Sequence, residues 1–307
     1  NLWIFQNNDE IYRIKPRKNL DVNLWWTSDE IRYGWKFVHS DDRLRLPVKA
    51  QFNEQHELDW TKAYEQVRKG FKQVVEEKGA GSLAALISPM LASEEAYLLS
   101  RAVRAIDPEA TIALGPVPIE GEDKTFPGGY TVYAEKCPNR RGVERAIKLV
   151  TGDDSVPDFD AFIEQVTDKA TQTAGMLLTG NYPSDWATKE LSGSLRNKFT
   201  VLIDTLAGAL SKKADVVLPG ATWTEKEGSF ENVNGRHQAF FPVISPIEFV
   251  KPEGQIAIDL HAAFTGERAE KYVASAVREQ MGTPFADEVH MPPSEEALEL
   301  DMEYVEL

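Results

Sequence analysis

The sequence lacks several features that define common classes of protein. It has a single cysteine, Cys137, among 307 residues. An internal disulfide is therefore excluded, and a reducing compartment is expected. No apolar run approaches the roughly 18 residues that span a bilayer, and no charged start followed by an apolar segment marks a signal peptide. We therefore expect no direct membrane insertion, so that any membrane association comes through partner proteins.

Basic residues are also scarce, with 34 Lys and Arg against 49 Asp and Glu and a net charge of -15. This balance argues against a nucleic-acid partner. About half of the excess lies in residues 286–307, which hold eight carboxylates and no Lys or Arg. The segment is typical of a solvated acidic tail. The alternative is a docking strand for a basic partner, because apolar side chains interleave the charges: Leu298, Leu300, Met302, Val305 and Leu307.

The remaining composition is that of a globular protein, with 42% hydrophobic and 27% charged residues. The first 47 residues read as β structure. Residues 2–6 and 10–15 flank a hairpin turn at Asn7, Asn8 and Asp9. Four of the seven tryptophans precede residue 36, which indicates a small packed layer or an interface.

After residue 59 the pattern predicts alternating strands and helices. Asp59 is the expected N-cap of a helix that stops at Gly79. Residues 115–140 contain too much Gly and Pro for a regular element. The strands are expected at 83–88, 111–114, 175–178, 200–203 and 215–218, and the helices at 60–78, 93–106, 141–150, 158–169, 187–195, 205–212, 254–264 and 269–280. This order favours parallel sheets with crossover helices.

The most informative segment is residues 214–238. A short apolar run ends at Pro219 and Gly220, and a polar loop with Asn232, Gly235 and Arg236 follows. This is how a parallel strand presents ligand-binding groups at its carboxyl end. The segment closely resembles the signature loop of the molybdopterin oxidoreductase superfamily. Residues 11–17 and 29–34 resemble the small iron-sulfur domain of that superfamily. Residues 85–106, 113–118 and 134–142 resemble the large peripheral-arm subunit of bacterial NADH-quinone oxidoreductase, respiratory complex I.

The resemblance implies an α/β fold of the formate dehydrogenase and DMSO reductase type. A small N-terminal β subdomain, residues 1–50, would be the remnant of the iron-sulfur domain. Two Rossmann-like parallel-sheet units would follow at 51–155 and 156–285, with the acidic tail at 286–307.

The departures from the family are informative. In its iron-sulfur domain four cysteine thiolates hold a [4Fe-4S] cluster. The resemblance places the last of these at Ser28 and the third upstream of Asn1, so we expect no cluster in this chain. The family's metal ligand would fall at Gly115 and Pro116, which offer no side-chain donor. We therefore expect no metal site and no catalytic residue, and we interpret Cys137 as a half-buried packing residue.

The resemblance also implies a vestigial pterin-dinucleotide site. Its candidate residues are Gly180, Asn181, Asp204, Asn232, Gly235 and Arg236. Glycine and short polar side chains would let the backbone approach a dinucleotide, and Asp204 could accept a hydrogen bond from a ribose or a guanine. Asn234 stands where the family usually has Glu. The competing interpretation is that the loop only closes the sheet and packs against its neighbours.

These observations favour a structural, catalytically silent part of the large peripheral-arm subunit of NADH-quinone oxidoreductase, without activity on its own and without bound molybdopterin. Iron-sulfur clusters would lie in upstream sequence and in the other proteins of the peripheral arm, on the cytoplasmic face of the bacterial plasma membrane. One alternative is an active molybdopterin-dependent oxidoreductase of formate dehydrogenase type. Another is a nucleotide-binding module, although no Gly-x-Gly-x-x-Gly fingerprint is present.

Overall fold

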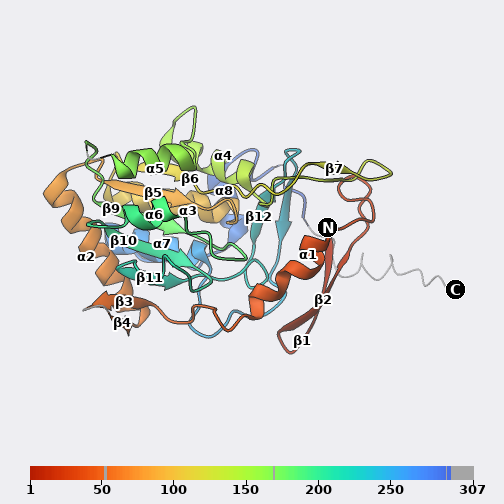
Figure 1. Cartoon of the computed structure of the whole chain (residues 1–307), viewed down its shortest axis with the longest axis horizontal. Coiled ribbons are helices and arrows are strands. Elements are labelled where there is room, and N and C mark those ends of the chain that lie inside the picture. Colours follow the sequence, from red (N-terminus) through yellow and green to blue (C-terminus); the bar gives the residue numbers. More distant parts are fainter. Residues whose placement is uncertain (52–53, 169, 288, 292–307) are drawn as a thin grey trace.

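The fold is built around one seven-stranded β-sheet (Figure 1). The computed structural model describes residues 1–51, 54–168, 170–287 and 289–291. The strand order is β4-β3-β11-β10-β9-β5-β6, in which β11 to β6 are parallel and the β3–β4 hairpin is antiparallel. The strands are β3 (Val48–Gln51), β4 (Glu54–Glu57), β5 (Leu83–Ile87), β6 (Thr111–Leu114), β9 (Gly175–Thr179), β10 (Phe199–Asp204) and β11 (Val216–Pro219).

The strands expected in two parallel-sheet units therefore share one sheet, because β5 pairs directly with β9. The mixed α/β architecture with a mostly parallel sheet is confirmed. The predicted strands and most predicted helices are also confirmed. The helix α2 (Trp60–Lys78) begins where the Asp59 carboxylate accepts from the Lys62 amide at 2.8 Å, and it ends at Gly79 with a φ of 87°. None of the helices in the described residues is long and apolar enough to cross a membrane.

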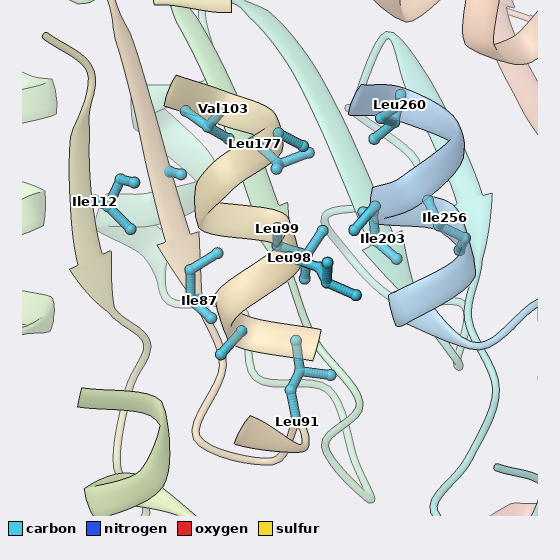
Figure 2. Close-up of a cluster of buried hydrophobic side chains, with 14 of the residues drawn as sticks. Ile87, Leu91, Leu98, Leu99, Val103, Ile112, Leu177, Ile203, Ile256 and Leu260 are labelled. Atoms are coloured by element: carbon cyan, nitrogen blue, oxygen red, sulfur yellow. The ribbon is translucent and has the colours of Figure 1, made fainter. Parts of the chain in front are cut away.

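Helices cover both faces of the sheet. On one face α2, α3 (Ser93–Ile106) and α7 (Glu253–Thr265) pack against alternate strand residues such as Ile87, Leu177 and Ile203. Figure 2 shows these side chains between α3, α7 and the strands. On the other face α5 (Phe159–Thr167) and α6 (Lys189–Ser194) pack against the complementary positions, including Leu86 and Leu178. Full burial on both faces explains the uninterrupted apolar runs of the strands.

The N-terminal region forms a separate two-stranded ribbon, β1 (Leu2–Asn7) and β2 (Glu10–Pro16), at one end of the molecule (Figure 1). Asn8 and Asp9 take positive φ values in the turn, as the hairpin prediction requires. The expectation of β structure throughout the first 47 residues is wrong. A helix, α1 (Asp29–Tyr33), and a 3-10 helix, η1 (Gly34–His39), follow the ribbon, and Ser28 caps α1 by accepting from the Ile31 amide.

Three further expectations need correction. Residues 205–212 form turns rather than a helix, and the helix predicted at 269–280 begins only at α8 (Ala274–Met281). The polar loop after β11 contains an unpredicted hairpin, β12 (Gly228–Glu231) and β13 (His237–Phe240). The segment at 115–140 contains only the short pair β7 (Lys124–Thr125) and β8 (Thr131–Val132) before α4 (Arg140–Thr151). Most of the acidic tail, residues 288 and 292–307, lies outside the described residues.

Candidate functional site

The candidate site lies at the carboxyl ends of the five parallel strands. The strand order reverses between β5 and β9, because β6 extends the sheet on one side while β9, β10 and β11 extend it on the other. In open α/β sheets ligands bind outside the carboxyl ends of the strands at such a switch point. A dinucleotide would therefore be expected here.

Side chains of the protein itself close this switch point. The buried Thr179 hydroxyl donates to the Leu86 carbonyl at 3.0 Å and accepts from the Ser88 amide at 2.8 Å, which joins the ends of β5 and β9. The Tyr182 hydroxyl donates to the Pro116 carbonyl at 2.7 Å, and its side chain is buried. The pKa of Tyr182 is raised by this burial. The crevice between the two strands is consequently filled with protein atoms.

Gly180, Asn181 and Asp204 do meet at this edge of the sheet. The Asp204 carboxylate accepts from the amides of Asn181 and Thr205 at 2.9 and 2.7 Å and from the Trp186 indole at 2.8 Å. Burial raises the pKa of Asp204, and these hydrogen bonds oppose the rise. A Cβ atom on Gly180 would lie 2.2 Å from the Asp204 carboxyl carbon. Gly180 therefore makes room for Asp204 rather than for a ligand.

Asn181 continues into a buried ionic cluster. Its side-chain amide donates to the Ala221 carbonyl at 2.8 Å and to Glu253 at 2.7 Å. Lys226 pairs with Glu253 and, at 2.9 Å, with Glu95. All three charged side chains are at most 1% exposed. Because one cation serves two carboxylates, burial and repulsion from Glu95 raise the pKa of Glu253 to about 8 against the attraction of Lys226.

The helix N-termini beside the sheet are occupied by carboxylates of the chain. Helix N-termini bind anions such as phosphates because free amides and the helix dipole favour negative charge. Glu95 in the first turn of α3 accepts from the Ala92 amide at 3.0 Å. Its neighbour Glu94 accepts from the Ser229 amide at 2.8 Å and pairs with Arg278. Glu253 occupies the first turn of α7. The N-termini of α3 and α7 therefore already carry carboxylates of the protein where an anionic ligand would bind.

A second buried ion pair fixes the same loop to the N-terminal region. Arg43 donates to Glu225 at 2.8 Å, and both side chains are at most 1% exposed. Glu225 also accepts from the Thr222 amide and hydroxyl at 2.7 and 2.9 Å. Thr222 and Glu225, in the first half of the segment 214–238, are therefore buried in the protein interior.

Asn232, Gly235 and Arg236 lie elsewhere, in the turn between β12 and β13. The Asn232 side-chain carbonyl accepts from the amides of Asn234 and Arg236 at 3.0 and 2.9 Å. Gly235 has a φ of 80°, which the turn requires. Arg236 lies 3.9 Å from Asp21. The fold therefore divides the six candidate residues between the strand ends and this turn.

Next to the turn, the Glu231 carboxylate contacts two arginine side chains and one histidine side chain. It is buried, accepts a hydrogen bond from Arg141 of α4 at 3.3 Å, forms an ion pair with Arg145 at 3.1 Å and contacts His237 at 3.1 Å. Beside this cluster is a cavity of about 420 Å³ lined by Arg145, Gly235, Arg236, His237, Asp287, Val289 and His290. Glu231 lies at the end of β12 and holds the hairpin against α4.

The thiol and carboxylate groups of the described residues form no cluster suited to a metal ion. Burial and the neighbouring Glu135 raise the pKa of the Cys137 thiol to about 12, so it is not a thiolate at neutral pH. Among the described residues, no three His, Cys, Asp or Glu side chains lie close enough to hold a metal ion together. Ser28, at the expected cluster position, serves as a helix cap.

Reasoning from sequence missed the buried charges Glu94, Glu95, Lys226 and Glu253. Two signals for them exist. Acidic residues follow Ala92 and Ser93 at the start of a predicted helix, which is typical of a first turn. The charged run from Glu225 to Glu227 lies in the loop that follows the buried strand β11, where buried charges need partners.

The residues at the strand ends do not fit a pterin dinucleotide. Small-molecule sites are cavities of roughly 300–1,000 Å³. The cavity beside Asp204, Trp186 and Leu206 measures about 10 Å³, which is enough for one water molecule at most. At the strand ends the Asp204 carboxylate and the Asn181 side chain bond to neighbouring groups of the protein instead.

Comparisons with known proteins agree with the architecture. Residues 162–263 match the family model described as molybdopterin oxidoreductase, and this part of the chain is similar to that family. The fold is similar to that of acetylene hydratase from Pelobacter acetylenicus, with a TM-score of 0.53 and 10% identity over 86% of this chain and 67% of that one. At this identity the likeness concerns the fold alone.

Relatives found by sequence similarity match only a third of this chain. Proteins named "Putative formate dehydrogenase" from Staphylococcus haemolyticus and Staphylococcus aureus MRSA252 are 26% and 25% identical over 103 residues. The match covers 34% of this chain and 10% of each relative.

Proposed function

We propose that this chain is a cofactor-free structural unit derived from a molybdopterin oxidoreductase domain. One observation carries the proposal: the carboxyl ends of the parallel strands are closed by the chain's own side chains. Thr179 and Tyr182 fill the switch point, and Glu94, Glu95 and Glu253 occupy the helix N-termini. No described group is placed to perform acid-base or nucleophilic catalysis there.

We further propose that the unit belongs to the peripheral arm of a bacterial NADH-quinone oxidoreductase. It would be the part of the large peripheral-arm subunit that supports electron transfer from NADH through iron-sulfur clusters to quinone. The resemblance of residues 85–106, 113–118 and 134–142 to that subunit supports this assignment. The clusters would lie in other segments and in partner proteins, and the protein would lie on the cytoplasmic face of the plasma membrane.

Cofactor binding can be measured directly. The purified chain should contain no stoichiometric molybdenum or tungsten, and GTP and NADH should leave its melting temperature unchanged. Arg236→Ala should lower thermal stability slightly without removing any ligand affinity. A nucleotide affinity that disappears with Arg236 would contradict the structural assignment.

The role in a respiratory complex needs a separate measurement. A tagged full-length protein should copurify with NADH-oxidising activity, and deletion of the unit should lower NADH-quinone activity of membranes without changing formate oxidation. Copurification with formate oxidation instead would contradict the assignment to NADH-quinone oxidoreductase.

The second candidate is an oxidoreductase of formate dehydrogenase type that binds a pterin guanine dinucleotide. The names of the staphylococcal relatives favour it. It predicts stoichiometric molybdenum or tungsten and formate-dependent dye reduction. The absence of a metal donor at Gly115 and Pro116 and the closed strand ends argue against it.

A further inference from the structure

The turn between β12 and β13 contains a dipeptide that the proposed function does not use. Asn234 precedes Gly235, and this is the only place among the 307 residues where glycine follows asparagine. Asn234 is exposed, unlike the charged residues at the strand ends. Because residue 235 has no side chain, its backbone nitrogen is not shielded from the side-chain carbonyl carbon of Asn234. The two groups can therefore approach each other.

A neighbouring hydroxyl group activates this carbonyl. Tyr133 directly follows β8, and its hydroxyl donates to the Oδ1 atom of Asn234 at 3.2 Å. A hydrogen bond to a carbonyl oxygen draws electrons from the carbonyl carbon. It also stabilises the negative charge that the oxygen gains when a nucleophile adds to that carbon. The Asn234 side chain is thus held with its oxygen next to a donor.

Hydrogen bonds within the turn oppose the approach. The Gly235 amide donates to the Asn232 carbonyl at 2.9 Å. The Asn232 side chain accepts from the Asn234 and Arg236 amides at 3.0 and 2.9 Å. The Gly235 nitrogen can react only after it leaves the Asn232 carbonyl, so a reaction proceeds from a locally opened turn. The population of this open turn sets the rate.

We propose that Asn234 is a site of spontaneous deamidation. In the open turn the Gly235 nitrogen loses its proton to solvent base and attacks the Cγ atom of Asn234. The bond from Cγ to the side-chain nitrogen breaks, and that nitrogen takes a proton from water and leaves as ammonia. Water then opens the cyclic imide to aspartate or isoaspartate. One water molecule enters and one ammonia leaves, without an oxidant or a reductant.

The modification changes the attachment of the hairpin. Either product adds a negative charge next to Gly235, whose Cβ position would lie 3.6 Å from Nη2 of Arg141. This charge competes with Glu231, which holds β12 against α4 through Arg141. Isoaspartate also adds one carbon atom to the backbone, and this displaces the amides that the Asn232 side chain holds. The hairpin therefore loosens from α4 as the protein ages.

Peptide mass spectrometry of the incubated protein tests the proposal. After incubation of the folded 307-residue protein at mildly alkaline pH, Asn234 should be converted to aspartate and isoaspartate. Asn8 is the internal control, because it is an exposed asparagine in a hairpin turn but precedes Asp9. It should remain unchanged. No conversion at Asn234 in the folded protein, while the urea-unfolded chain deamidates there, would overturn the proposal. So would equal rates at Asn234 and Asn8.

Two variants test the parts played by the turn and the hydroxyl. Asn232→Ala removes the side-chain acceptor that holds the turn closed, so conversion of Asn234 should be about fivefold faster. Tyr133→Phe removes the donor at the carbonyl oxygen, and conversion should be about fivefold slower. Faster conversion in Tyr133→Phe would show that the hydroxyl restrains Asn234 instead, and would overturn its assigned role.

Hydrogen exchange measures the consequence for the hairpin. The amides of β12 should exchange faster in Asn234→Asp than in the unmodified protein, because the new carboxylate competes for Arg141. Exchange in β5 and β9 should be equal in both proteins, as the control. Equal exchange of β12 in both would overturn the proposed loosening of the hairpin.

Discussion

At the carboxyl ends of the strands, charged side chains are buried and paired within the chain, whereas on the β1–β2 ribbon charged and aromatic side chains face solvent. Lys226 is 2% exposed and contacts two carboxylates, while Tyr12 is 60% exposed. The difference indicates where interactions remain available. At the strand ends the charged groups pair within the protein, whereas among the described residues the ribbon strands pair only with each other and leave aromatic side chains exposed.

The largest expected effect comes from breaking the buried cluster. Lys226→Met would leave Glu95 and Glu253 buried without their cation, so the free energy of unfolding should fall by about 3–5 kcal/mol. Urea denaturation measures this loss. The matched control is Lys62→Met in the exposed pair with Asp59, which should leave stability unchanged. A loss below about 1 kcal/mol for Lys226→Met would show that the cluster is not buried in solution.

The next effect concerns the space between Gly180 and Asp204. Gly180→Ala would place a Cβ atom against the Asp204 carboxyl group and should cost about 2 kcal/mol in unfolding free energy. Gly193→Ala in α6 has no atom within 4 Å of its new Cβ and should instead stabilise the protein by up to about 1 kcal/mol. If both substitutions stabilise the protein, the strand ends hold free space that could admit a ligand.

The pH dependence of stability reports on Glu253. Its carboxyl pKa is raised from 4.5 to about 8 in the folded protein, so the folded state keeps a proton that the unfolded chain releases. This contribution is complete below about pH 4.5 and is lost as the pH rises through 8, with a slope of at most about 1.4 kcal/mol per pH unit. Glu253→Gln should flatten the unfolding free energy between about pH 5 and 8. An unchanged slope in this variant would assign the dependence to other groups.

The smallest effect is expected on the ribbon surface. Tyr12→Ser removes an exposed ring and should change the unfolding free energy by less than about 0.5 kcal/mol. The adjacent Ile11 is 3% exposed, and Ile11→Ala should cost about 2–3 kcal/mol. Thermal denaturation of both variants compares the two faces of the ribbon. Similar losses in both would mean that the outward face is also packed.

The regular elements were predictable because their signals are local. Apolar runs, the Asp59 cap and the Gly79 stop define strands and helices without knowledge of distant partners. The helix predicted at 205–212 is wrong because its amides bond elsewhere. The Ala207 amide donates to the Asp42 carbonyl and the Ala209 amide to the Asp185 side chain, at 2.8 and 3.2 Å. Such contacts cannot be read from a window of sequence.

The candidate site was only partly predictable for the same reason. Sequence reasoning identified Gly180, Asn181 and Asp204, which do lie together at the strand ends. It could not show that Asp204 would be satisfied by Asn181 and Trp186, because their pairing depends on the fold. Nor could it pair Lys226 with Glu95 and Glu253, since neither partner is near it in sequence.

The packing around Gly115 bears on whether a metal-binding side chain could arise there by mutation. A Cβ atom at this position would lie 3.0 Å from the Tyr182 hydroxyl and 3.1 Å from the Ser88 backbone. A single mutation from glycine to a metal-binding residue would therefore introduce crowding before it offered any benefit. A larger side chain at this position would require Tyr182 or the Ser88 backbone to move. If the proposed structural role is right, this close packing would oppose the appearance of a metal ligand by a single mutation.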